Sequence, residues 1–137
     1  MSAPLSIDVF PMRWGDMDAL GHLNNTVYFR FCEEARLRWL QERGWGLRPG
    51  MESGAILAAA SCQFRAQLKY PCDVLVETSL HKVGNSSFVL HHRIARNDAP
   101  DATAAEAESV VVWCDYAAGK SLTLPVSLRK QLTGAEI

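Results

Sequence analysis

One long amphipathic segment, followed almost entirely by strand-like segments, restricts this chain to a small set of folds. Between residues 25 and 43 the apolar positions recur at spacings of three, one, three and four, which places them on one face of an α-helix. These positions are Tyr28, Phe31, Cys32, Ala35 and Trp39. Gly44 follows the segment and is a natural residue to end a helix. A helix with this much apolar surface must bury it against another part of the chain.

The start of this helix is marked by polar residues that can cap it. Asn24, Asn25 and Thr26 each carry a side-chain oxygen that can accept a hydrogen bond from the free N–H groups of a first helical turn. The residues before them, WGDMDALGH, contain two glycines and two aspartates and are typical of a turn. The sequence therefore predicts a polar turn leading directly into a buried helix.

The other segments show the composition and alternation of strands. They are Leu5–Arg13, Ile56–Leu68, Val74–Val83, Ser87–Ala95 and Thr103–Tyr116, and Val126–Leu132 adds one or two helical turns. Short connectors with turn residues separate the last four strands, which favours antiparallel neighbours. The predicted fold is α+β, with an antiparallel five-stranded sheet wrapped around one long central helix. We expect a single domain over residues 1–137.

Composition excludes several classes of function. The formal net charge is −1, so no basic surface favours nucleic acid. No apolar run approaches the roughly 20 residues of a membrane span, and the N-terminus MSAPLSIDVF lacks the features of a signal peptide. The expected location is therefore cytoplasmic. The four cysteines fit no zinc-binding spacing, so we expect no metal.

Asp16 and Asp18 lie two residues apart, immediately before the predicted helix. Both could be turn residues, one of them paired with Arg13. Alternatively, a carboxylate here could act as base or nucleophile on a carbonyl group, because the free N–H groups of a helix start stabilise an oxyanion. His22 adds a further possibility, a His–Asp general base, although a histidine in such a turn is more often structural.

A family resemblance rests on this stretch. DMDALGHLNN followed by VYFRFCEEAR resembles the N-terminal signature of hot-dog fold acyl-CoA thioesterases of the 4-hydroxybenzoyl-CoA thioesterase-like group. The matching positions are Asp16, Asp18, Gly21, His22, Asn24, Asn25, Tyr28, Phe31, Glu34, Ala35 and Arg36. YPCDVLVET, GNSSF and VWCDYAAGKSLTLP repeat later features of the family, with Cys72 where the family usually has glycine.

The resemblance implies a function and a site. Asp18 would be the catalytic carboxylate, acting as nucleophile or as the base that activates water. The backbone N–H of Asn25 would polarise the thioester carbonyl, while His22 and Asn24 would shape the turn. The substrate would be an acyl-CoA, with no metal or organic cofactor. The resemblance also implies a homodimer or homotetramer with active sites at the subunit interface.

Two alternatives to an acyl-CoA thioesterase stay open. One is a thioesterase for acyl-carrier-protein thioesters, and the other is a non-catalytic acyl-CoA-binding protein on the same fold. The sequence does not choose among the cations available for the CoA phosphates. These are Arg65, Lys69, Lys82, Arg93, Arg96, Arg129 and Lys130.

Overall fold

Helix α1 (Asn25–Glu42) begins and ends at residues suited to those positions. In the computed structural model, which describes residues 3–134, the Asn24 side chain accepts a hydrogen bond from the Thr26 N–H at 2.9 Å. Asn24 is therefore the N-cap among the three candidates. At the other end, Gly44 adopts a φ of 85°, which favours glycine, and its N–H donates to the Gln41 carbonyl.

The predicted apolar face of α1 is buried along its whole length. Tyr28, Phe31, Cys32, Ala35 and Trp39 are each at most 3% exposed. The Phe31 ring stacks on Phe10 with 5.6 Å between centroids, which joins the first half of the helix to the first strand. Trp39 packs in a second cluster that includes Phe88 and Leu128. The prediction that this helix forms the centre of the core is confirmed.

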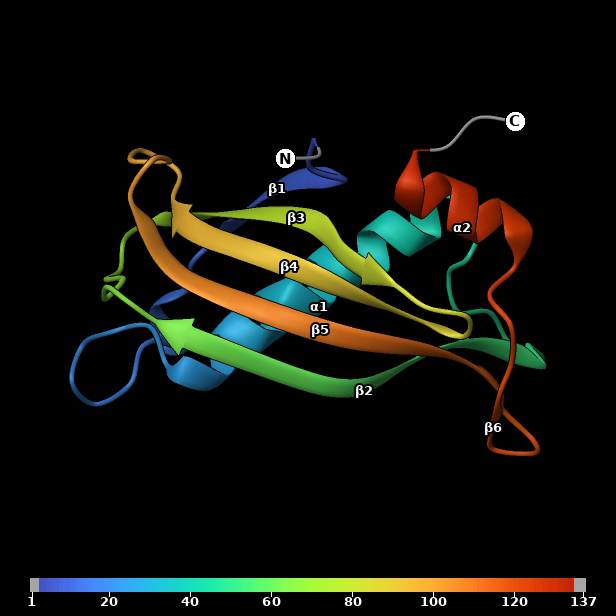
Figure 1. The fold of residues 1–137 in the computed structure, drawn as a ribbon. Helices are drawn as coiled ribbons and strands as arrows, with labels where there is room; N and C mark the ends of the chain where they lie inside the picture. Colours follow the sequence, from blue (N-terminus) through green and yellow to red (C-terminus); the bar gives the residue numbers. More distant parts are fainter. Residues whose placement is uncertain (1–2, 135–137) are drawn as a thin grey trace.

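An antiparallel sheet curls around α1 and supplies the other side of the core (Figure 1). In the described residues its strands are β1 (Ser6–Pro11), β2 (Ser53–Phe64), β3 (Asp73–Val83), β4 (Ser87–Arg96), β5 (Thr103–Asp115) and the short β6 (Lys120–Ser121). The order is β1-β3-β4-β5-β2, with β6 pairing with β5. Strands β1 and β2 therefore form the two long edges, and β2 runs beside α1. This is the architecture that the family resemblance implied.

The structure adds a sixth strand to the five predicted and moves several strand ends, with β2 beginning at Ser53 and β5 ending at Asp115. Asp115 Oδ1 accepts the N–H groups of Ala117 and Ala118, each at 3.0 Å, and the resulting turn lets Lys120 pair with Asp115. Strand β1 ends at Pro11 and β2 ends at Phe64. The residues after β2 form a loop, although their apolar pattern resembles a strand, and Leu68 is buried there.

The last helix, α2 (Val126–Thr133), confirms the predicted helical turns near the C-terminus. Leu128 and Leu132 point into the second core cluster and attach α2 to the sheet. The end of the predicted fraying segment TGAEI, residues 135–137, lies outside the described residues. Neither helix in residues 3–134 is both long enough and apolar enough to cross a bilayer.

Candidate active site

Asp16 is the structural member of the aspartate pair. Its side chain is buried and accepts hydrogen bonds from the Arg13 N–H at 2.9 Å and from Arg30 Nη2 at 3.1 Å. Burial by itself raises the pKa of Asp16, but these hydrogen bonds and the two arginine charges outweigh it and lower the pKa below 3.8. The predicted pairing with Arg13 is present, and Arg30 on α1 adds the contact that fixes the turn to the helix.

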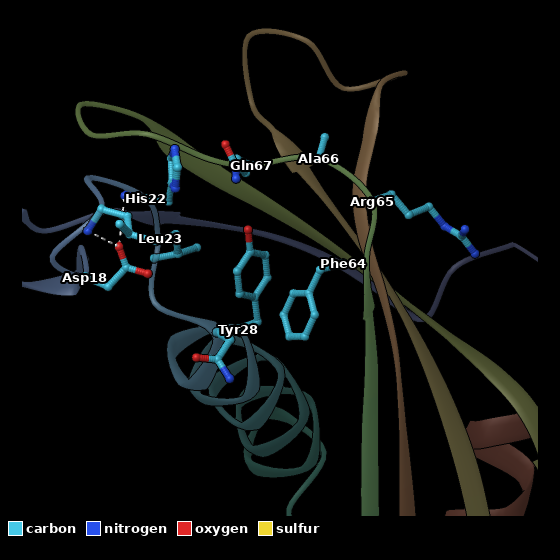
Figure 2. A pocket seen from close by; sticks show the side chains of 10 residues that line it. Asp18, His22, Leu23, Tyr28, Phe64, Arg65, Ala66 and Gln67 are labelled. Atoms are coloured by element: carbon cyan, nitrogen blue, oxygen red, sulfur yellow. Dashed lines mark hydrogen bonds between the residues drawn. The ribbon is translucent and has the colours of Figure 1, made fainter.

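Asp18 faces the solvent-accessible side of the same turn. One carboxylate oxygen, Oδ1, accepts the backbone N–H groups of Leu20 at 2.9 Å and His22 at 3.3 Å. Within residues 3–134 no hydrogen bond reaches the other oxygen, Oδ2. Figure 2 shows the carboxylate held by the turn at one side of a cavity. The turn therefore orients the carboxylate and leaves one oxygen available.

The start of α1 supplies an unpaired donor to the same cavity. Asn25 is the first residue of the helix and lines the cavity. Its N–H makes no hydrogen bond to any residue in the described part of the chain, as expected for a first-turn donor. Asn24 lies one residue before it and holds the helix start through Thr26. The Asn24 N–H in turn donates to the Asp16 carbonyl at 2.9 Å.

His22 lies in the cavity wall but does not form the side-chain pair with Asp18 that a His–Asp base would need. The contact between the two residues is made by the His22 backbone N–H. In Figure 2 the imidazole ring is turned away from the Asp18 carboxylate. The geometry favours the structural role for His22 that the sequence already favoured.

The far wall of the cavity comes from β2 and the loop after it, where sequence reasoning had selected only Arg65, as a candidate phosphate-binding cation. Phe64, Arg65, Ala66 and Gln67 line this side of a cavity of about 390 Å³. The Phe64 ring meets Tyr28 edge-on with 5.0 Å between centroids (Figure 2). Nothing near residue 64 in the sequence signals this contact, because it depends on β2 returning along α1. Of these two aromatic residues, only Tyr28 was identifiable from the sequence, through the family motif.

All four arginines among the candidate phosphate-binding cations already have partners. Arg65 forms an ion pair with Glu106 at 2.7 Å, and its side chain points away from Asp18 in Figure 2. Arg93 and Arg96 pair with Glu77 and Asp98. Arg129 donates to the Gly84 carbonyl. No cluster of three or more potential metal ligands occurs among residues 3–134.

Solved structures resemble the whole fold, including the elements that carry this site. The PA2801 protein of Pseudomonas aeruginosa, named "a putative Thioesterase", matches with a TM-score of 0.88 and 36% identity over 92% of this chain and 96% of that one. A Xanthomonas campestris protein named "putative acyl-CoA thioesterase" matches with 0.79 and 30% identity over 88% and 99%. A gentisyl-coenzyme A thioesterase matches with 0.79 and 25% identity over 93% and 99%.

Sequence comparisons agree with these structural matches. YsmA of Bacillus subtilis is 24% identical over 81 residues, which span 59% of this chain and about half, 54%, of that protein. The family model of the Thioesterase-like superfamily matches residues 12–132, which include the aspartate turn, α1 and strands β2 to β6 but not β1. The chain therefore belongs to the Thioesterase-like superfamily and has the hot-dog fold of its thioesterase neighbours.

Proposed function

We propose that this protein is an acyl-CoA thioesterase that hydrolyses its substrate to a free acid and CoA, with Asp18 as the catalytic carboxylate. The main support for the proposal is that two groups without hydrogen-bond partners lie in the same cavity. Asp18 Oδ2 accepts no hydrogen bond within residues 3–134, and the Asn25 N–H donates none. A thioester carbonyl placed between them would meet a nucleophilic or basic oxygen and an oxyanion donor.

The chemistry can follow either of two routes from this arrangement. In one, Asp18 Oδ2 attacks the carbonyl carbon, the C–S bond breaks, CoA leaves as a thiolate that takes a proton from solvent, and water hydrolyses the acyl anhydride. In the other, Asp18 takes a proton from a water molecule that attacks the carbonyl directly, the C–S bond then breaks, and the CoA thiolate takes up a proton. In both routes the negative charge on the carbonyl oxygen develops beside the Asn25 N–H.

The surrounding residues support these two roles. Asp16 fixes the turn to α1 through Arg30, and Asn24 caps the helix so that the next N–H, that of Asn25, stays free. His22 contributes its backbone N–H to hold Asp18 Oδ1. The Tyr28–Phe64 pair forms an apolar side of the cavity suited to an acyl group.

The proposal includes a homo-oligomer, a dimer or tetramer, with the active site shared between subunits. Strand β2 is an edge of the sheet, and Ile56, Leu57 and Phe64 on it are between 42% and 48% exposed. An exposed apolar edge strand of this length favours pairing with another copy. Because Phe64 also lines the cavity, a second copy pairing with β2 would lie close to the active site.

The test is a hydrolysis assay on the parent protein and two matched variants. Asp18→Asn keeps the shape of the side chain but removes the basic oxygen, so kcat should fall by about 100-fold to 10,000-fold with little change in melting temperature. Asp98→Asn makes the same chemical change at a surface carboxylate paired with Arg96 and should leave kcat at the parental value. Parental turnover in Asp18→Asn would refute the assignment of Asp18.

The substrate panel separates the proposed function from its alternatives. Short, long and aromatic acyl-CoAs should release thiol at rates above the uncatalysed reaction. Faster hydrolysis of the same acyl groups on acyl carrier protein would point to the carrier-protein alternative. Tight acyl-CoA binding without hydrolysis would point to the non-catalytic alternative, on the same fold and with the same cavity.

A further inference from the structure

A second cavity lies along the line where α1 packs beside β2, which we call the α1–β2 seam. The candidate active site lies along the same line. It has a volume of about 430 Å³, and its walls include Cys32, Arg36, Leu57, Ala60, Ala107 and Ser109. Strand β2 runs back along the helix (Figure 1). Phe64 meets Tyr28 near the helix start, whereas Ala60 and Leu57 line the second cavity together with Cys32 and Arg36 of later turns. The second cavity therefore lies further towards the helix C-terminus than the first, and the two have no lining residue in common.

Arg36 is a buried cation in this cavity without a carboxylate partner. The residue is 6% exposed, and its recorded hydrogen bond runs from Nη1 to Ser109 Oγ at 3.2 Å. No carboxylate in residues 3–134 lies within 4 Å of the guanidinium. A guanidinium has five N–H donors, and a buried charge normally has a counter-ion or a full set of hydrogen bonds. An anion entering the cavity would supply a counter-ion and would also accept hydrogen bonds from the guanidinium.

The other charged residues around the cavity do not neutralise Arg36 closely. Arg30 lines the cavity, but its guanidinium binds Asp16. Glu33 is exposed at the rim, one turn before Arg36. The Glu108 carboxylate lies 3.7 Å from His81 Nε2. Arg36 is thus a cation in the cavity wall that has no carboxylate within 4 Å among the described residues, and the nearby Glu33 carboxylate is exposed.

A series of hydrogen-bonded, buried polar side chains holds Arg36 in position. Ser109 Oγ contacts His92 Nε2 at 2.9 Å, and His92 Nδ1 contacts Thr78 Oγ1 at 2.9 Å. Burial, together with the Arg36 and His91 charges, lowers the pKa of His92 to about 3, so the imidazole is neutral. A neutral chain positions Arg36 without supplying a counter-charge, and the remaining guanidinium donors stay available to a ligand.

The spacing of Arg36 from the proposed reaction centre fits a linear acyl group. Arg36 lies eleven positions after Asn25, which corresponds to about 16 Å along the helix axis. Helical side chains lean towards the N-terminus, so the gap between the two groups is shorter than this. Apolar side chains line part of each cavity, Tyr28 and Phe64 in the first and Cys32 and Ala60 in the second. A medium-length hydrocarbon chain would span the two cavities.

We propose that Arg36 binds a carboxylate at the far end of the acyl group, and that the preferred substrates are medium-chain thioesters of dicarboxylic acids. This inference rests on the proposed function for the position of the thioester at Asp18 and Asn25. The carboxylate would accept two hydrogen bonds from the guanidinium, and the methylene chain would lie along the α1–β2 seam. A substrate ending in a methyl group would leave the buried guanidinium unpaired.

The kinetic test compares acyl-CoAs that differ only at the far end of the chain. Hexanoyl-, octanoyl-, decanoyl- and dodecanoyl-CoA are each measured against the thioester of the dicarboxylic acid of the same length. The parent should favour the dicarboxylic member of at least one pair by 10-fold or more in kcat/KM. Arg36→Met, which keeps an unbranched apolar stem but removes the charged guanidinium, should lose this preference. Arg38→Met, on the same helix but bound to Asp8, should retain it.

A binding test separates failure of this inference from failure of the proposed hydrolase. Free octanedioate should raise the melting temperature of the parent more than octanoate at equal concentration, whether or not any thioester is cleaved. Arg36→Met should abolish the difference. If this variant does not fold, Leu57→Glu, which places a carboxylate in the cavity wall near Arg36, should abolish it instead.

Two results would overturn the inference. One is hydrolysis in which the parent favours the methyl-ended thioester at every length. The other is an unchanged preference, or an unchanged melting response, in both Arg36→Met and Leu57→Glu. A third outcome would also contradict it: the parent is a dimer that does not respond to octanedioate, and Arg36→Met is a folded monomer. That outcome would assign Arg36 to the contact between subunits and not to substrate binding.

Discussion

Asp16 and Asp18 are two residues apart, and the turn between them gives their carboxylates opposite environments. Asp16 is 3% exposed and bound to arginines, whereas Asp18 is exposed and held by backbone N–H groups through one oxygen. A carboxylate with all its hydrogen-bonding capacity used inside the protein stabilises the fold. One with a free oxygen at a cavity is available for chemistry.

Asp16→Asn should reduce stability at neutral pH by about 1–3 kcal/mol, the usual value of hydrogen bonds to a charged group. The folded state lowers the pKa of Asp16 below 3.8, so this contribution is present above pH 3.8 and is lost as the pH falls through the folded pKa. Urea unfolding at pH 7 and at pH 3 measures the effect. The difference in unfolding free energy between parent and variant should be smaller at pH 3 than at pH 7. A larger difference at pH 3 would contradict the structural role of Asp16.

His92 should make the stability of the parent pH-dependent in mildly acidic solution. The folded state lowers its pKa from 6.5 to about 3, so the unfolded chain binds more protons between these values. Stability should therefore fall as the pH drops below 6.5, by up to about 1.4 kcal/mol per pH unit from this residue. Urea unfolding of His92→Gln should show a shallower pH slope than the parent. His91→Gln, which makes the same change at the next position, is the matched control.

At the scale of elements, α1 connects the core to the candidate active site. Its apolar face is buried against the sheet, which fixes where the helix begins relative to β2 and the aspartate turn. The Arg30–Asp16 ion pair ties that turn to the helix surface. The position of the Asn25 N–H thus depends on packing further along the helix as well as on the local cap.

Phe31→Ala should destabilise the protein by roughly 3–5 kcal/mol, because it leaves a cavity where the ring is 1% exposed and stacked on Phe10. Leu37→Ala, on the same helix at a position that is 38% exposed, should cost less than about 1 kcal/mol. Denaturant unfolding of both variants measures the difference. Equal, small effects would mean that α1 does not form the centre of the core in solution.

For the whole molecule, the sheet has two long edges with different surroundings. β1 contributes no residue to either cavity, whereas β2 contributes Phe64 to the first and Leu57 and Ala60 to the second. Pairing of a second copy along β2 would enclose both cavities. Pairing along β1 would enclose neither.

Light scattering of the parent in dilute solution should therefore give a dimer or tetramer. Ile56→Lys introduces a charge on β2 at a position that is 42% exposed, and it should shift the protein towards the monomer with loss of activity. Ile7→Lys makes the same change on β1, at a position that is 57% exposed, and should preserve the parental state. A parent that is monomeric while it turns over acyl-CoA would contradict the shared active site.

The local sequence was sufficient to predict most of the elements and the polar turn before α1, although it missed the short β6. The helical spacing of Tyr28 to Trp39 reflects burial on one face, and the capping role of Asn24 depends only on residues within one turn. The turn around Asp18 is likewise closed by hydrogen bonds to Leu20 and His22. Contacts of this range leave a readable pattern because the interacting residues are neighbours in the chain.

Tertiary structure alone decided what surrounds that turn. Arg30 reaches Asp16 across 14 positions, Phe64 meets Tyr28 across the α1–β2 seam, and Arg36 contacts Ser109 across 73 positions. These partners are set by how the sheet curls and which edge lies against the helix, and no local pattern encodes that choice. The motif predicted Asp18 and Asn25, but the cavity walls and the unpaired Arg36 became visible only once β2 was placed beside α1, because burial and pairing are properties of the packed chain.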